Sequence, residues 1–94
     1  MVMNLKKKIK NKVAIVTGAG SGIGKAVALG LAREGVDTYL AGRKKDKLLT
    51  TKQISIKENN EGICHVIKCD VSKETDVRKM FMLIQKDHGR LDLL

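Results

Sequence analysis

The chain has 94 residues and a formal net charge of +9, with 43% hydrophobic and only 2% aromatic residues. This length allows one small domain with a limited core. With so few aromatic side chains there is no stacking platform for single-stranded nucleic acid, so we expect no nucleic-acid partner. Because no apolar stretch reaches transmembrane length and no signal peptide is recognisable, we expect no membrane contact and a cytoplasmic location.

Lysines gather ahead of the first predicted strand, at Lys6, Lys7, Lys8, Lys10 and Lys12. We interpret residues 1–11 as a basic leader. Two explanations for it remain open: attraction of anions such as nucleotide phosphates or nucleic acid, or a solvated segment with no ligand.

A first strand is predicted over 12–17 and an amphipathic helix over 23–34, with Ile23, Val27 and Leu31 on the stripe expected to be buried. Ala26 and Gly30 lie beside this stripe, and their small size should let the helix approach the sheet closely. The glycine-rich stretch 17–24 joins them. A loop of this kind seats a dinucleotide pyrophosphate, because the first N–H groups of a helix have no intrahelical partner and carry partial positive charge. The phosphate-loop candidates are Gly18, Gly22 and Gly24. The alternative is a structural glycine turn without a ligand.

Further strands are predicted over 38–41 and 63–69, and further helices over 44–59 and from the N-cap Ser72 to His88, with the start of a fourth strand at 91–94. This alternation predicts an α/β fold, a Rossmann-type doubly wound parallel sheet that is incomplete, with strand order 3-2-1-4. The first two helices should share one face of the sheet and the third should lie on the other. Cys64 and Cys69 are expected to be buried free thiols, and no metal site is predicted.

Four spaced motifs resemble the short-chain dehydrogenase/reductase family over residues 12–94, namely Thr17-Gly18-x-x-x-Gly22-Ile23-Gly24, Ala41-Gly42-Arg43, Cys69-Asp70-Val71 and Gly89-Arg90-Leu91-Asp92-Leu93-Leu94. The resemblance implies the cofactor-binding part of an oxidoreductase that passes hydride between a nicotinamide cofactor and a carbonyl or alcohol substrate. Because family members are far longer, we interpret residues 12–94 as an NAD(P)-binding domain truncated at its C-terminus. A homo-oligomer is then possible only in the complete protein.

The resemblance also assigns roles to single residues. The backbone N–H of Ile23 should meet the pyrophosphate, and Thr17 should hold the loop. The carboxylate of Asp70 should receive the adenine amino group, and the N–H of Val71 should meet the adenine ring. The alternative for Asp70 is that it caps the following turn, and both roles are compatible.

The end of the second strand selects between the two nicotinamide cofactors. An acidic residue there binds the ribose 2′-hydroxyl of NAD, but this chain has Gly42 followed by Arg43. A guanidinium can pair with the 2′-phosphate of NADP, and Ser21 and Lys44 lie where family members often add contacts to it. We therefore expect NADP in preference to NAD. The alternative for Arg43 and Lys44 is a solvated helix start, and two later lysines, Lys45 and Lys47, are predicted to be solvated.

No catalytic residue is predicted, because the family's serine and its Tyr-x-x-x-Lys pair are absent. The single tyrosine, Tyr39, is followed four positions later by Arg43 and lies in a predicted strand. We therefore expect the 94-residue chain alone to be inactive. A second hypothesis is a non-catalytic nucleotide- or anion-binding module, whose basic leader could serve nucleic acid. A downstream Tyr-x-x-x-Lys in the gene would decide for the dehydrogenase.

Overall fold

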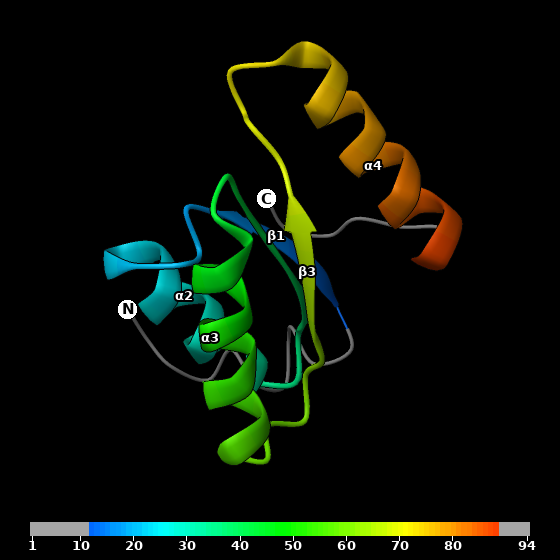
Figure 1. Ribbon diagram of the computed structural model, residues 1–94. Coiled ribbons are helices and arrows are strands. Elements are labelled where there is room, and N and C mark those ends of the chain that lie inside the picture. Colours follow the sequence, from blue (N-terminus) through cyan, green and yellow to red (C-terminus); the bar gives the residue numbers. More distant parts are fainter. Residues whose placement is uncertain (1–11, 89–94) are drawn as a thin grey trace.

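The computed structural model describes residues 12–88, in which strands and helices alternate (Figure 1). The elements are β1 (Val13–Thr17), α2 (Gly22–Arg33), β2 (Asp37–Gly42), α3 (Lys45–Lys57), β3 (Cys64–Lys68) and α4 (Glu74–His88). The predicted leader at 1–11 and the predicted start of a fourth strand at 91–94 lie outside the described residues.

The three strands form one parallel sheet in the order β1-β2-β3. Thr17 at the end of β1 pairs with Ala41, and Gly42 at the end of β2 pairs with Lys68. The carboxyl ends of all three strands therefore meet at one edge of the sheet. This edge collects the glycine loop, the turn after β2 and the turn after β3, which are the three segments that the sequence marks as functional.

Helices cover both faces of the sheet, as the ribbon in Figure 1 shows. On one face, alanines of α2 and Leu48 of α3 pack with Leu40 and Cys64. On the other face, Met80 and Ile84 of α4 pack with Tyr39 and the inner residues of β1. The predicted doubly wound α/β arrangement is confirmed, with the first two helices on one face and the third on the other. Both cysteines are buried and free, also as predicted.

The predicted buried stripe of α2 is wrong. Ile23 is 84% exposed and Val27 is 43% exposed, and the helix instead buries Ala28, Leu29 and Ala32. Small alanines let the helix axis approach the sheet more closely than valine and leucine would. Val27 and Leu31 consequently line a groove beside β1, together with Gly24 and residues 14–17.

Two other helices also leave part of their apolar residues exposed. In α3 the buried positions are Leu48, Thr51 and Ser55, whereas Leu49 and Ile56 are 42% and 64% exposed. In α4 Met80 and Ile84 are buried, but Phe81 is 38% exposed. Each exposed residue lies next to a buried one in sequence, so an apolar residue in these helices does not by itself mark the side that faces the sheet.

The glycine loop between β1 and α2 depends on three of its glycines. Gly18 and Gly22 have φ angles of +64° and +58°, a region that side chains with a β-carbon rarely adopt. Gly24 is required for a different reason. A β-carbon at Gly24 would lie 2.2 Å from the carbonyl oxygen of Gly18, so α2 can fold back against the end of β1 only without a side chain there.

A buried threonine of α3 fixes the same loop from the other side. The Thr51 hydroxyl donates to the carbonyl oxygen of Ala19 at 2.9 Å, and Thr51 and Ala19 are both fully buried. The N–H of Ala19 donates to the carbonyl oxygen of Ala41 in β2 at 3.4 Å. The loop is thus hydrogen-bonded to β2 and to α3, which both come later in the sequence.

We predict that Gly24→Ala destabilises the chain by about 3 kcal/mol or more, because the added methyl group meets backbone that cannot move aside. Gly30→Ala is the matched control in the same helix, since a β-carbon there meets nothing within 4 Å. That change should stabilise the chain by about 0.5–1 kcal/mol. Urea unfolding followed by circular dichroism measures both, and equal midpoints for the two variants would contradict the prediction.

We predict that Thr51→Val destabilises the chain by about 1–3 kcal/mol, because the buried carbonyl of Ala19 loses its hydroxyl donor. Thr50→Val is the control. Thr50 is exposed and its hydroxyl donates only within its own helix, to the carbonyl oxygen of Asp46 at 3.1 Å. This variant should stay within about 0.5 kcal/mol of the parent in urea unfolding. A Thr51→Val variant as stable as Thr50→Val would show that the bond to the loop contributes nothing.

Candidate functional site

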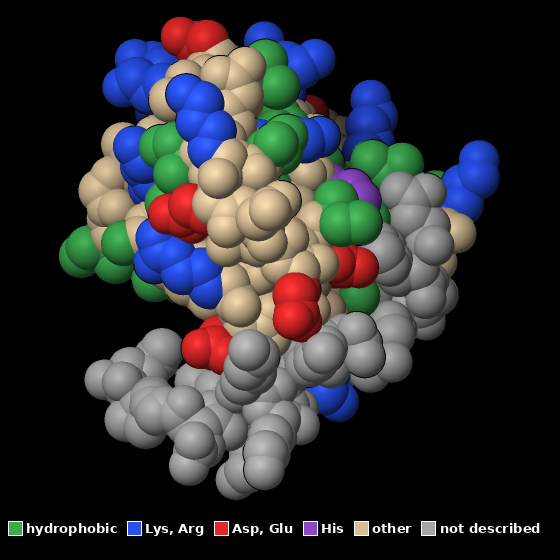
Figure 2. Space-filling model, turned by 90° about the horizontal axis from the view of Figure 1, so that it is seen from below, with side chains coloured by type: hydrophobic (Ala, Val, Ile, Leu, Met, Phe, Trp, Pro, Cys, Tyr) green, Lys and Arg blue, Asp and Glu red, His purple; other side chains and the backbone are tan. Residues whose placement is uncertain are grey.

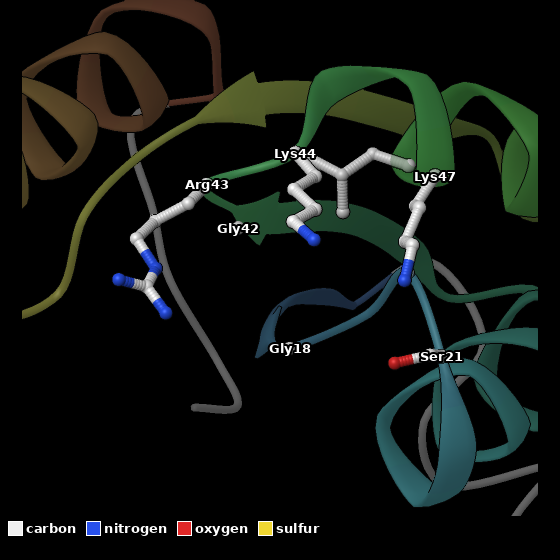
Figure 3. Close-up of a pocket in the computed structure, with 8 residues that line it drawn as sticks. Gly18, Ser21, Gly42, Arg43, Lys44 and Lys47 are labelled. Carbon is white, nitrogen blue, oxygen red and sulfur yellow. The ribbon is translucent and has the colours of Figure 1, made fainter.

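A pocket of about 220 Å³ opens at the carboxyl edge of the sheet, between the glycine loop and the start of α3 (Figure 3). Its lining consists of Gly18, Gly20, Ser21, Gly42, Arg43, Lys44, Lys47 and Leu48. In open α/β sheets this is the edge at which ligands bind. The volume is below the ~300–1,000 Å³ of pockets that enclose a whole drug-sized ligand. The pocket is therefore too small to enclose such a ligand whole.

The pocket is cationic. Three of its eight lining residues are Lys or Arg, and none carries a carboxylate. Figure 3 shows the amino groups of Lys44 and Lys47 pointing into the pocket toward Ser21, with the Arg43 guanidinium on the other side of Gly42. The N-terminus of α3, which begins just after Lys44, adds the partial positive charge of a helix end. This arrangement favours an anion.

Charges are mixed at the opposite, amino edge of the sheet. Figure 2, which looks up at this edge from below, shows acidic side chains beside Lys and Arg. Arg33 at the end of α2 donates to both carboxylate oxygens of Glu58, at 3.1 and 2.7 Å. This pairing raises the pKa of Arg33 and lowers the pKa of Glu58. The lining of the pocket carries no comparable carboxylate to neutralise its cations.

Ser21 occupies the N-cap position of α2 without capping it. Its backbone is extended, with φ −160° and ψ 163°, and its side chain makes no capping hydrogen bond. N-cap serines ordinarily accept a hydrogen bond from the first turn of the helix. Here the hydroxyl points into the pocket instead (Figure 3). The serine is thus available to a ligand.

Gly42 leaves the end of β2 without a side chain. A β-carbon at this position would lie 3.3 Å from the Cδ2 atom of Leu48, which is 1% exposed. Any larger residue would have to displace Leu48 by a few tenths of an ångström. No carboxylate from the end of β2 therefore faces the pocket, and Arg43 is the next side chain along the chain.

The turn after β3 is organised by Asp70. Its Oδ1 atom accepts hydrogen bonds from the backbone N–H and the hydroxyl of Ser72, at 3.0 and 2.6 Å. These two bonds lower the pKa of Asp70, and the nearby charges of Arg43 and Lys73 lower it further. The turn-capping role considered for Asp70 is thus present. Ser72 is not the helix N-cap predicted from sequence, because α4 begins two residues later, at Glu74.

The structure brings four predicted site residues together in the pocket, Gly18, Ser21, Arg43 and Lys44. The other predicted residues of the loop and of α2, Gly22, Ile23 and Gly24, adjoin the pocket in sequence without lining it. Asp70 and Val71 follow β3 outside the lining, with Val71 57% exposed. The site residues expected from the sequence are therefore divided between the pocket lining and the segments beside it.

Sequence reasoning did not assign Gly20, Lys47 or Leu48 to the site. Lys47 is solvent-exposed, as predicted, but it also lines the pocket. Its spacing of three residues from Lys44 places the two on one side of a helix, and this was the signal in the sequence that could have identified it.

No helix within residues 12–88 is both long and apolar enough to cross a membrane. In the same part of the chain, no three His, Cys, Asp or Glu side chains gather closely enough to hold a metal ion.

Known proteins to which this chain is similar include dehydrogenases and reductases. The sequence profile described as short chain dehydrogenase matches residues 12–94. The mouse protein named dehydrogenase/reductase SDR family member 1 is 38% identical over 92% of this chain and 27% of its own length. The farnesol dehydrogenase of Aedes aegypti is 39% identical over 88% of this chain and 34% of its own length.

Among solved structures, the L-sorbose reductase of Gluconobacter frateurii, complexed with NADPH and L-sorbose, has a TM-score of 0.81 and 34% identity. The match covers 90% of this chain and 32% of that one. The chain thus spans about a third of the length of these relatives. The glycine loop, the parallel sheet and the profile match over nearly the whole chain agree, and the chain belongs to the short-chain dehydrogenase/reductase family of oxidoreductases.

Proposed function

We propose that this chain is the cofactor-binding part of an NADP-preferring short-chain dehydrogenase. The observation that carries the proposal is the pocket after β2, where Gly42 replaces a carboxylate and Ser21, Arg43 and Lys44 surround the space. A hydroxyl and several cations suit a 2′-phosphate, whereas a ribose 2′-hydroxyl calls for a carboxylate acceptor. That a relative of 34% identity is complexed with NADPH supports the same choice.

The remaining site residues are proposed to hold the rest of the dinucleotide. Space above Gly18 and Gly22 is open, since an added β-carbon there would meet nothing within 4 Å. A pyrophosphate can therefore approach the backbone, with the N–H of Ile23 in the unpaired first turn of α2 as a donor. Ser72 occupies the Oδ1 atom of Asp70, so Oδ2 is the oxygen proposed to receive the adenine amino group, with the N–H of Val71 facing the ring.

The bound cofactor would supply hydride exchange between its nicotinamide and a carbonyl or alcohol carbon. This chain would bind and orient the cofactor, and the proton would be handled by a tyrosine outside it. The only tyrosine here, Tyr39, is 1% exposed in the central strand and stacks on His65 with ring centroids 4.5 Å apart. It is in no position to reach a substrate.

We expect the chain by itself to turn over no substrate, because it lacks the family's catalytic serine and its Tyr-x-x-x-Lys pair. The test follows NADPH absorbance with a panel of ketones and alcohols. Protein-dependent turnover by the purified chain would overturn this expectation. Binding of inorganic phosphate as tightly as of NADPH would instead favour the second candidate, a non-catalytic anion-binding module, for which the unneutralised cations of the pocket are the supporting observation.

Cofactor choice gives the sharper test. A charge-assisted contact to the 2′-phosphate contributes about 1.5–3 kcal/mol, which corresponds to a preference for NADPH over NADH of roughly ten- to a hundredfold. Because Arg43 is exposed, solvent and salt should bring the value toward the lower end. Gly42→Asp with Arg43→Leu should reverse the preference, since it supplies an acceptor for the hydroxyl and removes a phosphate partner.

The control for this pair is Gly42→Ala with Arg43→Leu, which adds the same β-carbon against Leu48 but no carboxylate. It should weaken NADPH binding without improving NADH binding. Dissociation constants for both cofactors, measured by nucleotide fluorescence, decide the question. Equal affinities in the parent, or an aspartate variant that behaves like its alanine control, would reduce Arg43 to a solvated residue at the start of a helix.

A further inference from the structure

Lys47 differs from the other lysine of its helical turn, Lys45. Both belong to the first turn of α3 and both are exposed. Only Lys47 lines the pocket, and Figure 3 shows its amino group directed toward Ser21 across the glycine loop. The two lysines therefore offer a matched comparison, because both are exposed cations of one helical turn and only Lys47 lines the pocket.

The base of Lys47 is fixed against the loop. A β-carbon on Gly20 would lie 2.7 Å from the β-carbon of Lys47, so this side of α3 can reach the loop only because Gly20 has no side chain. Leu48, next in sequence, is buried, and Thr51, one turn later, is bonded to the carbonyl of Ala19. The helix therefore holds the start of the Lys47 side chain in place, while its four-carbon stem lets the amino group adjust to a ligand.

The electrostatics of this turn favour a bound anion. Cations are disfavoured at a helix N-terminus, which is itself partially positive. Yet Lys44 stands at the N-cap of α3, without any side-chain capping bond, and Lys45 and Lys47 follow in the first turn. Asp46 is the only acidic residue of that turn, and it does not line the pocket. A phosphate monoester, which carries close to two negative charges at pH 7, would be attracted by both Lys44 and Lys47.

We propose that Lys47 is a specificity-determining residue for NADP, binding the 2′-phosphate together with Ser21 from the side of the pocket opposite Arg43. This proposal rests on the NADP preference proposed above. The phosphate would be held between Ser21 and Lys47 on one side and Arg43 on the other, with Lys44 between them. Gly20 then also contributes to the specificity, because its lack of a side chain leaves room for Lys47 beside the loop.

The test compares four variants of the full chain, Lys47→Gln, Lys47→Arg, Lys45→Gln and Ser21→Ala. The probes are 2′,5′-ADP and 5′-AMP, which differ by the 2′-phosphate, together with NADPH and NADH. We expect Lys47→Gln to weaken binding of 2′,5′-ADP and NADPH roughly five- to tenfold, as loss of one partly exposed charged contact should. Binding of 5′-AMP and NADH should change less than about twofold.

Lys47→Arg should restore most of the lost affinity, Lys45→Gln should match the parent, and Ser21→Ala should weaken the same two probes. Circular dichroism and urea melts of each variant establish that it is folded.

The role of Lys47 would be overturned if the parent prefers 2′,5′-ADP over 5′-AMP and Lys47→Gln leaves this preference intact. The proposed function would then still stand. Equal losses of affinity in Lys45→Gln and Lys47→Gln would also overturn this role, because the loss would then come from the lower total charge and not from the position of Lys47. A parent with no preference between the two probes would contradict the proposed NADP preference itself.

Discussion

The close approach of α2 to the end of β1 is the constraint on which the site depends. Gly24 lies so near the carbonyl of Gly18 that a single methyl group would not fit between them. This contact forces the chain to turn sharply through backbone conformations that only glycine adopts readily. It also directs the first turn of α2 at the space where the strands end. The open glycine loop is therefore a consequence of packing between a helix and a strand.

The second constraint is the bond from Thr51 to the loop. It joins α3 to a segment 32 residues earlier in the sequence. Because this bond and the contact at Gly20 both involve the side of α3 that carries Lys47 and Leu48, the loop and the start of α3 form one wall of the pocket. The cations of the pocket are thus attached to the glycine loop through buried contacts, although their charged groups are exposed.

Within residues 12–88, the two edges of the sheet differ in how their charges are paired. At the amino edge, Arg33 is paired with Glu58 between the ends of α2 and α3. At the carboxyl edge, the lining of the pocket contains cations without a carboxylate. Of these two places, the one beside the glycine loop is therefore the one whose cations remain available to attract an anion.

The sequence by itself determined the fold class, the order of the elements and the segments that form the site. Alternating apolar periodicities and the glycine spacing are local properties, and the parallel connection then requires the three strand ends to share an edge. The sequence did not determine which side of each helix faces the sheet. The predicted stripe through Ile23 and Val27 was wrong because α2 turns Ala28, Leu29 and Ala32 toward the sheet instead. Only the tertiary structure placed Lys47 in the pocket and Lys45 outside it, because that choice depends on how α3 rotates against Gly20 and Ala19, residues far away in the sequence.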